Sequence, residues 1–394
     1  MKRHHITASL LMLACALGCY ATTTLPVFRS TLKDYLQLTE AQYGLLMSIA
    51  LIPGAVGSLI AGWMTRRQKN NDLAWFPIAG LALTYLTLYF TRTFVPLLIG
   101  LACCGALWQS MSVIAQSALV TLFPNARRRV LTLTMVVISC FSAAFSNIAE
   151  ILVSSPRIPF PIAFHVPQVI ISILLSATLL ALALIAKRKH YAPIGPSSKP
   201  DAESIDTKPS LPMYLCLAAM ILHATADNLL MLWLPRVWEN ENLGALKPGH
   251  ILALYSLAYV ISRSILAILP ENTLQRTFLV LPGAAGCVLM VAALTIGGRA
   301  TAYCYLAGAL LWACEYPAFL AILAKLNPKW FGMFLSFVII GAGVLTTAAS
   351  TAIGAAIQSF NINLKSLLMV CPFAFASVSA IGLILCSTTL RTKQ

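Results

Sequence analysis

Long apolar segments separated by short polar ones recur from one end of this chain to the other. Each is about 20 residues long, the length an α-helix needs to cross a hydrocarbon layer of about 30 Å. The apolar runs are continuous rather than alternating in period two, so they predict helices and not the strands of a membrane barrel. We expect an all-α polytopic protein with twelve membrane-spanning helices, at residues 6–28, 42–62, 73–90, 94–122, 130–153, 166–186, 212–234, 250–269, 277–297, 300–323, 331–355 and 365–388.

The first apolar segment also has features of a secretory signal, since Lys2 and Arg3 precede it. It continues to about Val27, which is longer than the apolar core of a signal peptide, and no small-residue cleavage site stands out. We therefore interpret it as the first membrane helix, retained in the protein.

One long polar segment, residues 187–211, interrupts the pattern between the sixth and seventh predicted helices. It is rich in Pro and Ser and carries both signs of charge, which is typical of a flexible linker. The sequence therefore predicts two pseudo-symmetric six-helix bundles, an N-terminal one at 1–186 and a C-terminal one at 212–394, joined by a cytoplasmic linker.

The composition supports a membrane location. Hydrophobic residues make up 59% of the 394 residues and charged residues 10%, whereas a soluble domain has about 25% charged residues. With the N-terminus placed inside, eighteen of the 27 Lys and Arg residues fall in cytoplasmic segments, eight fall outside, and Arg263 lies within a span. This asymmetry follows the positive-inside rule and predicts two cytoplasmic termini in a bacterial-type inner membrane. It also explains the net charge of +15 without a nucleic-acid partner.

Several classes of function lack their motifs here. The eleven cysteines form no CxxC pair, and no Cys/His spacing indicates a metal site. There is no nucleotide-binding Gly-rich loop, no HExxH and no GxSxG. We expect no enzyme, no cofactor and no metal, and any work that the protein does would draw on an ion gradient or on the gradient of its own solute.

Ionisable residues inside membrane helices are costly and mark functional sites by default. Five residues meet this criterion and are our candidates for ion coupling: Asp227, His223, Glu315, Arg263 and Glu150.

His223 and Asp227 are four residues apart, so they share one face of a helix. Such a pair could take up and release a proton, and the alternative is a polar pair that only fixes helix packing. Glu315 and Arg263 lie at similar depths in their spans, which predicts an ion pair that is either functional or a static clamp. Glu150 comes near the outer end of its span, where we expect its carboxylate to reach water.

Aromatic rings beside amides and hydroxyls suit a sugar or polyol, which stacks its apolar face and hydrogen-bonds at its edge. Helix packing is the alternative explanation for these residue types. The candidates for solute binding are Trp108, Gln109, Gln116, Tyr20, Asn147, Asn228, Trp312 and Tyr316.

Short motifs resemble the major facilitator superfamily. The loop after the second predicted helix reads Gly62-Trp-Met-Thr-Arg66-Arg67, similar to the family pattern Gly-x-Leu-x-Asp-Arg, with Arg66 where members usually have Asp. A second similar segment is Phe123-Pro-Asn-Ala-Arg127-Arg-Arg. The resemblance implies a gating loop made by Gly62, Arg66, Arg67, Arg128 and Arg129, and it puts the usual Asp-based ion pair of that gate in doubt.

The second half is similar to the fucose-permease-like branch of that family, on His223-Ala-Thr-Ala-Asp227, the following Trp233-Leu-Pro and Tyr316-Pro. The resemblance implies that the first, fourth, seventh and tenth helices line a cavity at the bundle interface. It predicts a monomeric secondary transporter that moves a small organic solute by alternating access, coupled to protons or sodium, in the lipid bilayer. Two alternatives stay open: proton-driven efflux of amphipathic compounds, and a sensor or assembly protein without transport.

Overall fold

The computed structural model describes residues 2–39, 42, 45–46, 49–67, 71–187, 210–241, 247–270, 275–296, 298–360 and 362–391, and it contains helices but no strand within them. The helices of the N-terminal half are α1 (Lys2–Gly18), α2 (Tyr20–Thr24), α3 (Arg29–Leu36), α5 (Leu51–Arg67), η1 (Asn71–Ala74), α6 (Trp75–Leu88), α7 (Phe94–Leu122), α8 (Arg127–Ser154) and α9 (Phe160–Lys187). Those of the C-terminal half are α10 (Leu211–Glu241), α11 (Pro248–Ile268), α12 (Gln275–Ile296), α13 (Gly298–Trp312), α14 (Glu315–Leu326), α15 (Phe331–Phe360), α16 (Leu364–Leu368) and α17 (Val370–Arg391).

Ten apolar stretches of the described residues are long enough to cross a membrane. Two more predicted spans correspond to α5 and α6, of 17 and 14 residues. Three spans consist of two consecutive helices: α1 with α2, α13 with α14, and α16 with α17. The all-helical, twelve-span prediction agrees with this arrangement.

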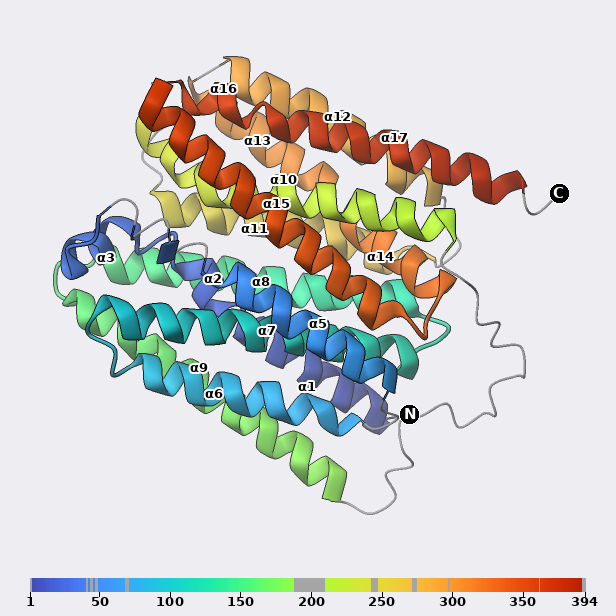
Figure 1. Cartoon of the computed structure of the whole chain (residues 1–394), viewed down its shortest axis with the longest axis horizontal. Helices are drawn as coiled ribbons and strands as arrows, with labels where there is room; N and C mark the ends of the chain where they lie inside the picture. Colours follow the sequence, from blue (N-terminus) through green and yellow to red (C-terminus); the bar gives the residue numbers. More distant parts are fainter. Residues whose placement is uncertain are drawn as a thin grey trace.

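The helices form two bundles that lie side by side (Figure 1). Helices α1 to α9 make one bundle and α10 to α17 the other, and spans that are consecutive in the chain run in opposite directions. The start of α1 and the end of α17 lie at the same end of the molecule, which we call the terminal end, and the other is the opposite end. The linker predicted at 187–211 falls almost entirely outside the described residues.

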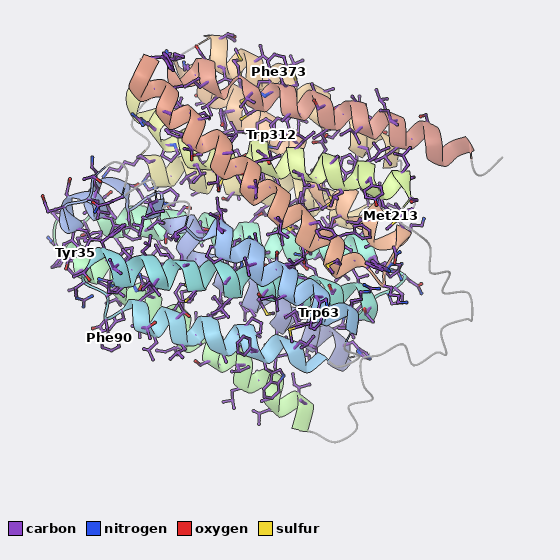
Figure 2. The ribbon with its side chains drawn as sticks, in the orientation of Figure 1. Tyr35, Trp63, Phe90, Met213, Trp312 and Phe373 are labelled. Carbon is purple, nitrogen blue, oxygen red and sulfur yellow. The ribbon has the colours of Figure 1, made fainter. Side chains whose placement is uncertain are left out.

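Large apolar side chains cover the outer surface of the bundles. Phe90 and Phe373 project outward, with 70% and 71% of their surface exposed, whereas Trp312 is fully buried inside the C-terminal bundle (Figure 2). A soluble protein would bury most of such residues, so the apolar exterior is a surface for lipid.

The tenth predicted span, 300–323, is interrupted at Ala313 and Cys314, between α13 and α14. Pro317 stands in the first turn of α14 and has no backbone N–H. The carbonyl of Ala313, four residues earlier, therefore lacks its usual helical donor. This leaves an acceptor in the middle of the C-terminal bundle.

Candidate functional site: a polar network between the bundles

Asp227 of α10 is held by two tyrosines of α11. Its Oδ1 accepts a hydrogen bond of 2.5 Å from the Tyr255 hydroxyl and a second one from Tyr259. The two hydroxyls lie 2.9 Å apart, and Trp312 Nε1 donates to Tyr259 at 2.8 Å. Two hydroxyls thus donate to one oxygen of a half-buried carboxylate, and Trp312 orders one of those hydroxyls.

Arg263 continues this network toward the other bundle. Its guanidinium lies 4.4 Å from the ring centroid of Tyr259, and its charge acts on Asp227. Arg263 Nε donates to the free carbonyl of Ala313 at 3.1 Å, and Nη1 donates to Ser139 Oγ of α8 at 2.8 Å. A carboxylate inside the C-terminal bundle is therefore connected, through one arginine, to a side chain of the N-terminal bundle.

His223 pairs with a different acid from the one that the sequence predicted. Its Nδ1 lies 3.1 Å from Glu315 Oε2, and both side chains are buried. No hydrogen bond joins His223 to Asp227 among the described residues, although they share a helix. The predicted His223–Asp227 pair is therefore wrong: His223 faces Glu315, while Asp227 Oδ1 accepts from Tyr255 and Tyr259 of the neighbouring helix.

The predicted ion pair between Arg263 and Glu315 is also wrong. Glu315 is the first residue of α14 and faces His223, while Arg263 faces Ala313 and Ser139. The sequence correctly placed Arg263 and Glu315 at similar depths in the membrane, since Arg263 bonds to Ala313, two residues before Glu315. The break between α13 and α14 changed the direction in which Glu315 points.

The prediction that the Glu150 carboxylate reaches water is wrong. Glu150 is 5% exposed, and its Oε2 accepts a 2.9 Å hydrogen bond from the backbone N–H of Gly249, in the first turn of α11. Ser154 donates to the other oxygen at 2.7 Å. Free N–H groups and the helix dipole make a helix N-terminus a favourable partner for a carboxylate, which explains the buried position. One turn earlier, Asn147 Oδ1 lies 2.9 Å from His250 Nδ1.

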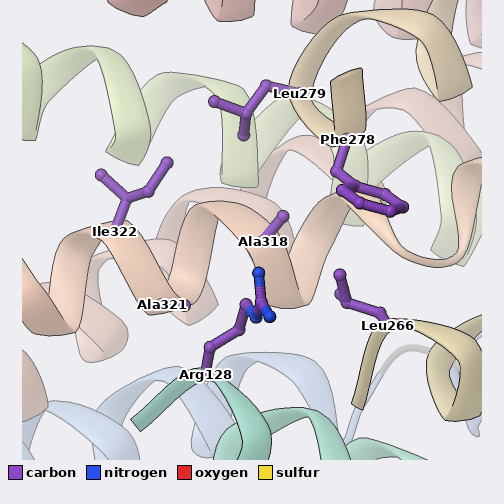
Figure 3. Close-up of a pocket in the computed structure, with 7 residues that line it drawn as sticks. All are labelled: Arg128, Leu266, Phe278, Leu279, Ala318, Ala321 and Ile322. Carbon is purple, nitrogen blue, oxygen red and sulfur yellow. The ribbon is translucent and has the colours of Figure 1, made fainter. Parts of the chain in front are cut away.

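The other end of α11 is held by basic residues of the same helix α8. Arg128 donates to the carbonyls of Leu269 and Pro270, and Arg129 Nε donates to Ala267 at 3.2 Å. These carbonyls end α11, where the helix dipole favours cations. The Arg128 side chain also borders a small cavity with apolar walls from α11, α12 and α14, of about 10 Å³, close to the least that holds one water molecule (Figure 3).

Helices α8 and α11 are thus joined along their whole length by polar contacts, and we call this contact the α8–α11 seam. From the opposite end to the terminal end, its contacts are Glu150–Gly249, Asn147–His250, Ser142–Ser256, Ser139–Arg263, Arg129–Ala267 and Arg128–Leu269.

The second contact between the bundles, the α5–α15 seam, is made of small residues. Gly62 faces Ser336 and the Gly332 backbone so closely that a methyl group there would overlap them. Ser336 Oγ donates to the Ser58 carbonyl at 2.5 Å. At the terminal end, the Arg66 guanidinium lies 3.5 Å from the ring centroid of Trp330.

Arg66 therefore makes a cation–π contact at the position where Asp is expected from the motif. The side chain of Arg67 lies outside the described residues.

The solute-binding candidates of the N-terminal bundle are largely engaged in packing. Trp108 Nε1 donates to the Cys15 carbonyl at 3.0 Å, and Tyr20 packs edge-on against Tyr85. Gln109 touches the backbone position of Gly54. Gln116 is buried, and its Oε1 has no hydrogen-bond partner among the described residues.

In the C-terminal bundle, Trp312 and Tyr316 border the acidic residues. Trp312 stacks on Phe375 with ring centroids 4.7 Å apart, and the Tyr316 ring lies 6.0 Å from that of His223. Asn228 is half-buried on α10 beside Asp227. The structure thus brings Asp227, Arg263 and Trp312 into one network, with His223, Glu315 and Tyr316 beside it, and leaves the N-terminal candidates apart from it.

Sequence reasoning missed Tyr255, Tyr259 and Ser139. The two tyrosines could have been found from their spacing, because Tyr255, Tyr259 and Arg263 recur every four residues and so line one face of α11. Ser139 carries no such signal, because a serine in an apolar helix is common. Within the described residues, no group of three or more His, Cys, Asp or Glu side chains is positioned for a metal ion, and the eleven cysteines form no disulfide.

A family model for the major facilitator superfamily matches residues 10–329. The chain belongs to this superfamily. Its members are transporters rather than enzymes, so the chain is a multi-pass membrane protein of a transporter family. A sequence search of curated proteins finds no match.

Solved structures of the superfamily share the fold of this member over nearly their whole length. The transporter FucP in its outward conformation superposes with a TM-score of 0.73 at 17% identity, covering 97% of this chain and 98% of FucP. A single-substitution variant of the E. coli fucose:proton symporter FucP gives 0.72 at 16% identity, covering 98% of both chains. The proton:xylose symporter XylE, bound to a glucose derivative, gives 0.71 at 12% identity, covering 99% of this chain and 96% of XylE.

Proposed function

We propose that this protein is a secondary active transporter that moves a sugar or similar small metabolite by alternating access, coupled to protons through Asp227. The observation that carries the proposal is the connection from the Asp227 carboxylate, through Tyr259 and Arg263, to Ser139 of the other bundle. The fold shared with a fucose:proton symporter and a proton:xylose symporter supports the class of solute and of coupling ion.

The coupling step follows from charge balance. With Asp227 ionised, its charge offsets that of Arg263, and the tyrosine hydroxyls both donate to it. A proton on Asp227 removes that negative charge, so Arg263 is left as an uncompensated cation in a low-dielectric interior. Contact with water or solute would then stabilise the Arg263 guanidinium more than its bonds to Ser139 and Ala313 do. Loss of these bonds would weaken the middle of the α8–α11 seam.

The solute would bind between the bundles beside this network. Tyr316 offers an aromatic face and Asn228 an amide, the combination that suits a polyol. His223 and Glu315 are further coupling candidates beside Asp227. The gating loop would comprise Gly62, Arg66, Arg67, Arg128 and Arg129, whose described members lie at or near the terminal end of the two seams.

We further propose the cellular arrangement that the charge distribution favours. The terminal end would face the cytoplasm of a bacterial-type cell, with the protein in its inner membrane as a monomer. The bundles would comprise residues 1–186 and 212–394, and residues 187–211 would be the cytoplasmic linker.

The test is uptake by proteoliposomes that contain the purified protein, screened against a panel of sugars and polyols with an imposed pH gradient. For an accepted solute, Asp227→Asn should abolish accumulation driven by the gradient while it retains exchange of labelled for unlabelled solute. The exposed carboxylate of Asp34 on α3 provides the control variant, Asp34→Asn, which should accumulate solute normally. Unchanged accumulation by Asp227→Asn would remove this residue from coupling. Efflux of amphipathic dyes without sugar uptake would favour the exporter alternative.

A further inference from the structure

The Glu315 carboxylate has one oxygen that the polar network does not use. Oε2 faces His223, but Oε1 is buried and has no hydrogen-bond partner among the described residues, and Glu315 as a whole is 0% exposed. The backbone N–H of Gly283 lies near this carboxyl. When Glu315 is ionised and His223 is neutral, the buried negative charge needs a cation beside it.

A second unpartnered oxygen lies beside it. Ser379 Oγ of α17 is buried at 6% exposure and also lacks a hydrogen-bond partner among the described residues. Many helical serines and threonines among the described residues donate to a carbonyl one turn back, as Ser377 does to Phe373 at 2.9 Å. Ser379 makes no such bond, and its hydroxyl oxygen lies inside the bundle close to Gly283 of α12.

Both oxygens lie close to Gly283 of α12, which has no side chain to separate them. A methyl group added there would overlap both Glu315 Oε1 and Ser379 Oγ, and it would lie 3.0 Å from the carbonyl oxygen of Phe375. Three oxygens of different kinds therefore converge beside one glycine: a carboxylate, a hydroxyl and a backbone carbonyl. A carbonyl retains a second lone pair when it accepts a helical hydrogen bond, so Phe375 is still able to contribute.

We propose that this niche, formed by Glu315, Ser379, Phe375 and Gly283, binds a sodium ion. Hard cations prefer carboxylate, hydroxyl and carbonyl oxygens, and a monovalent charge neutralises the one carboxylate present. The ion would tie α14 to α17 inside the C-terminal bundle, and His223 would connect it to α10. The inference deepens the proposed function by adding a second coupling ion to it, but the binding site itself does not require that function to be correct.

Sodium binding is measured on the purified protein in detergent, without solute or gradient. Thermal unfolding in sodium chloride is compared with unfolding in potassium chloride and choline chloride at equal ionic strength, and bound ²²Na⁺ is counted at equilibrium. The wild type should show a saturable rise of at least about 2 °C in the unfolding midpoint that is specific to sodium, together with one bound tracer ion per chain.

Two variants remove the site in independent ways. Ser379→Ala deletes a hydroxyl that has no partner, so in choline it should be as stable as the wild type while losing the sodium effect. Gly283→Ala fills the niche and should lose both the sodium effect and the tracer. The matched controls are Ser377→Ala, on the same helix, and Gly354→Ala, where nothing lies within 4 Å of an added methyl group.

Three results would overturn the sodium site. They are a wild type without any specific response to sodium, an equal response in Ser379→Ala, and a stabilisation that follows acidification in choline but not sodium, which would assign the niche to a proton. A sodium response in a protein that transports no sugar would keep the site and refute the proposed function. Sugar transport without a sodium response would do the reverse.

Discussion

The two seams between the bundles use opposite chemistry. The α8–α11 seam holds its helices by hydrogen bonds and charges, with acid at one end of α11 and base at the other. The α5–α15 seam holds its helices by close approach of small residues such as Gly62 and Gly332, with one hydroxyl contact at Ser336. Polar contacts are directional and are lost at once when a helix shifts, while small-residue surfaces tolerate sliding. The polar seam is therefore suited to report a change of charge, and the small-residue seam to accommodate the movement.

The largest effect should come from the middle of the polar seam. Arg263→Met leaves Asp227 without its cation, and Ser139 and Ala313 without their donor. Removing one partner of a buried charged network costs about 3–5 kcal/mol in stability. Without this cation the charge of Asp227 no longer acts on the seam, so we expect uptake driven by the pH gradient to be abolished. Proteoliposome uptake checks this expectation, with Arg92→Met as the control, since Arg92 is exposed and contacts its close sequence neighbours Tyr89 and Thr91. Near-normal uptake by Arg263→Met would show that the seam does not sense Asp227.

The next effect concerns the small-residue seam. Gly62→Ala places a methyl group against Ser336 and the Gly332 backbone, so we expect a loss of about 1–3 kcal/mol in stability from overpacking. Thermal unfolding in detergent measures it.

Gly354→Ala is the control for this substitution, because open space surrounds it. It should be neutral or slightly stabilising, since alanine favours helix more than glycine does. Equal midpoints for the two variants would contradict the close approach at Gly62.

A smaller effect is expected at the opposite end of the polar seam. Glu150→Ala removes the acceptor for the Gly249 N–H, and the loss of such a helix cap costs about 0.5–2 kcal/mol. Glu150→Gln keeps a neutral acceptor and should lose less. Thermal unfolding distinguishes the two, and hydrogen exchange at the start of α11 should be faster in the alanine variant. Identical unfolding of all three proteins would mean that this contact contributes nothing to the seam.

The smallest effect should come from the exposed cation–π contact. Arg66→Gln removes the charge above the Trp330 ring and should cost about 0.5–1 kcal/mol, visible as a small fall in the unfolding midpoint. Arg66→Lys should keep part of the stability but lose the planar stacking of the guanidinium. Arg66→Asp restores the usual residue of the family motif. A gain in stability from that change would show that the cation–π contact is a poor replacement for the ion pair.

The sequence predicts the spans well and their contacts poorly, for a physical reason. Hydrophobic length identifies a span by itself, and the helix expected at 94–122 is α7 without any shift. Contacts between helices depend on how each helix is rotated about its axis. A segment that is apolar on several sides does not fix this rotation, so the sequence does not predict its contacts. His223 and Asp227 lie on one helix as predicted, but His223 contacts Glu315 and Asp227 contacts Tyr255, both on other helices.

Local irregularity accounts for the other errors. The break before Glu315 redirected its side chain, and the free N–H groups at the start of α11 drew Glu150 away from water. Both are properties of helix ends inside the membrane. The prolines that cause such helix ends are visible in a sequence. The side chain that bonds to the backbone groups left free at these ends is not.

The spacing of contacts along α8 has a mechanical consequence. Ser142, which meets Ser256, lies eight residues from Glu150 and fourteen from Arg128, or about 12 Å and about 21 Å along the axis. A tilt of α11 about this pair of serines would act as a lever with unequal arms. The same rotation would displace the terminal end by nearly twice the distance of the opposite end. A tilt in one direction would therefore open the terminal end widely, and the reverse tilt of equal size would open the opposite end less.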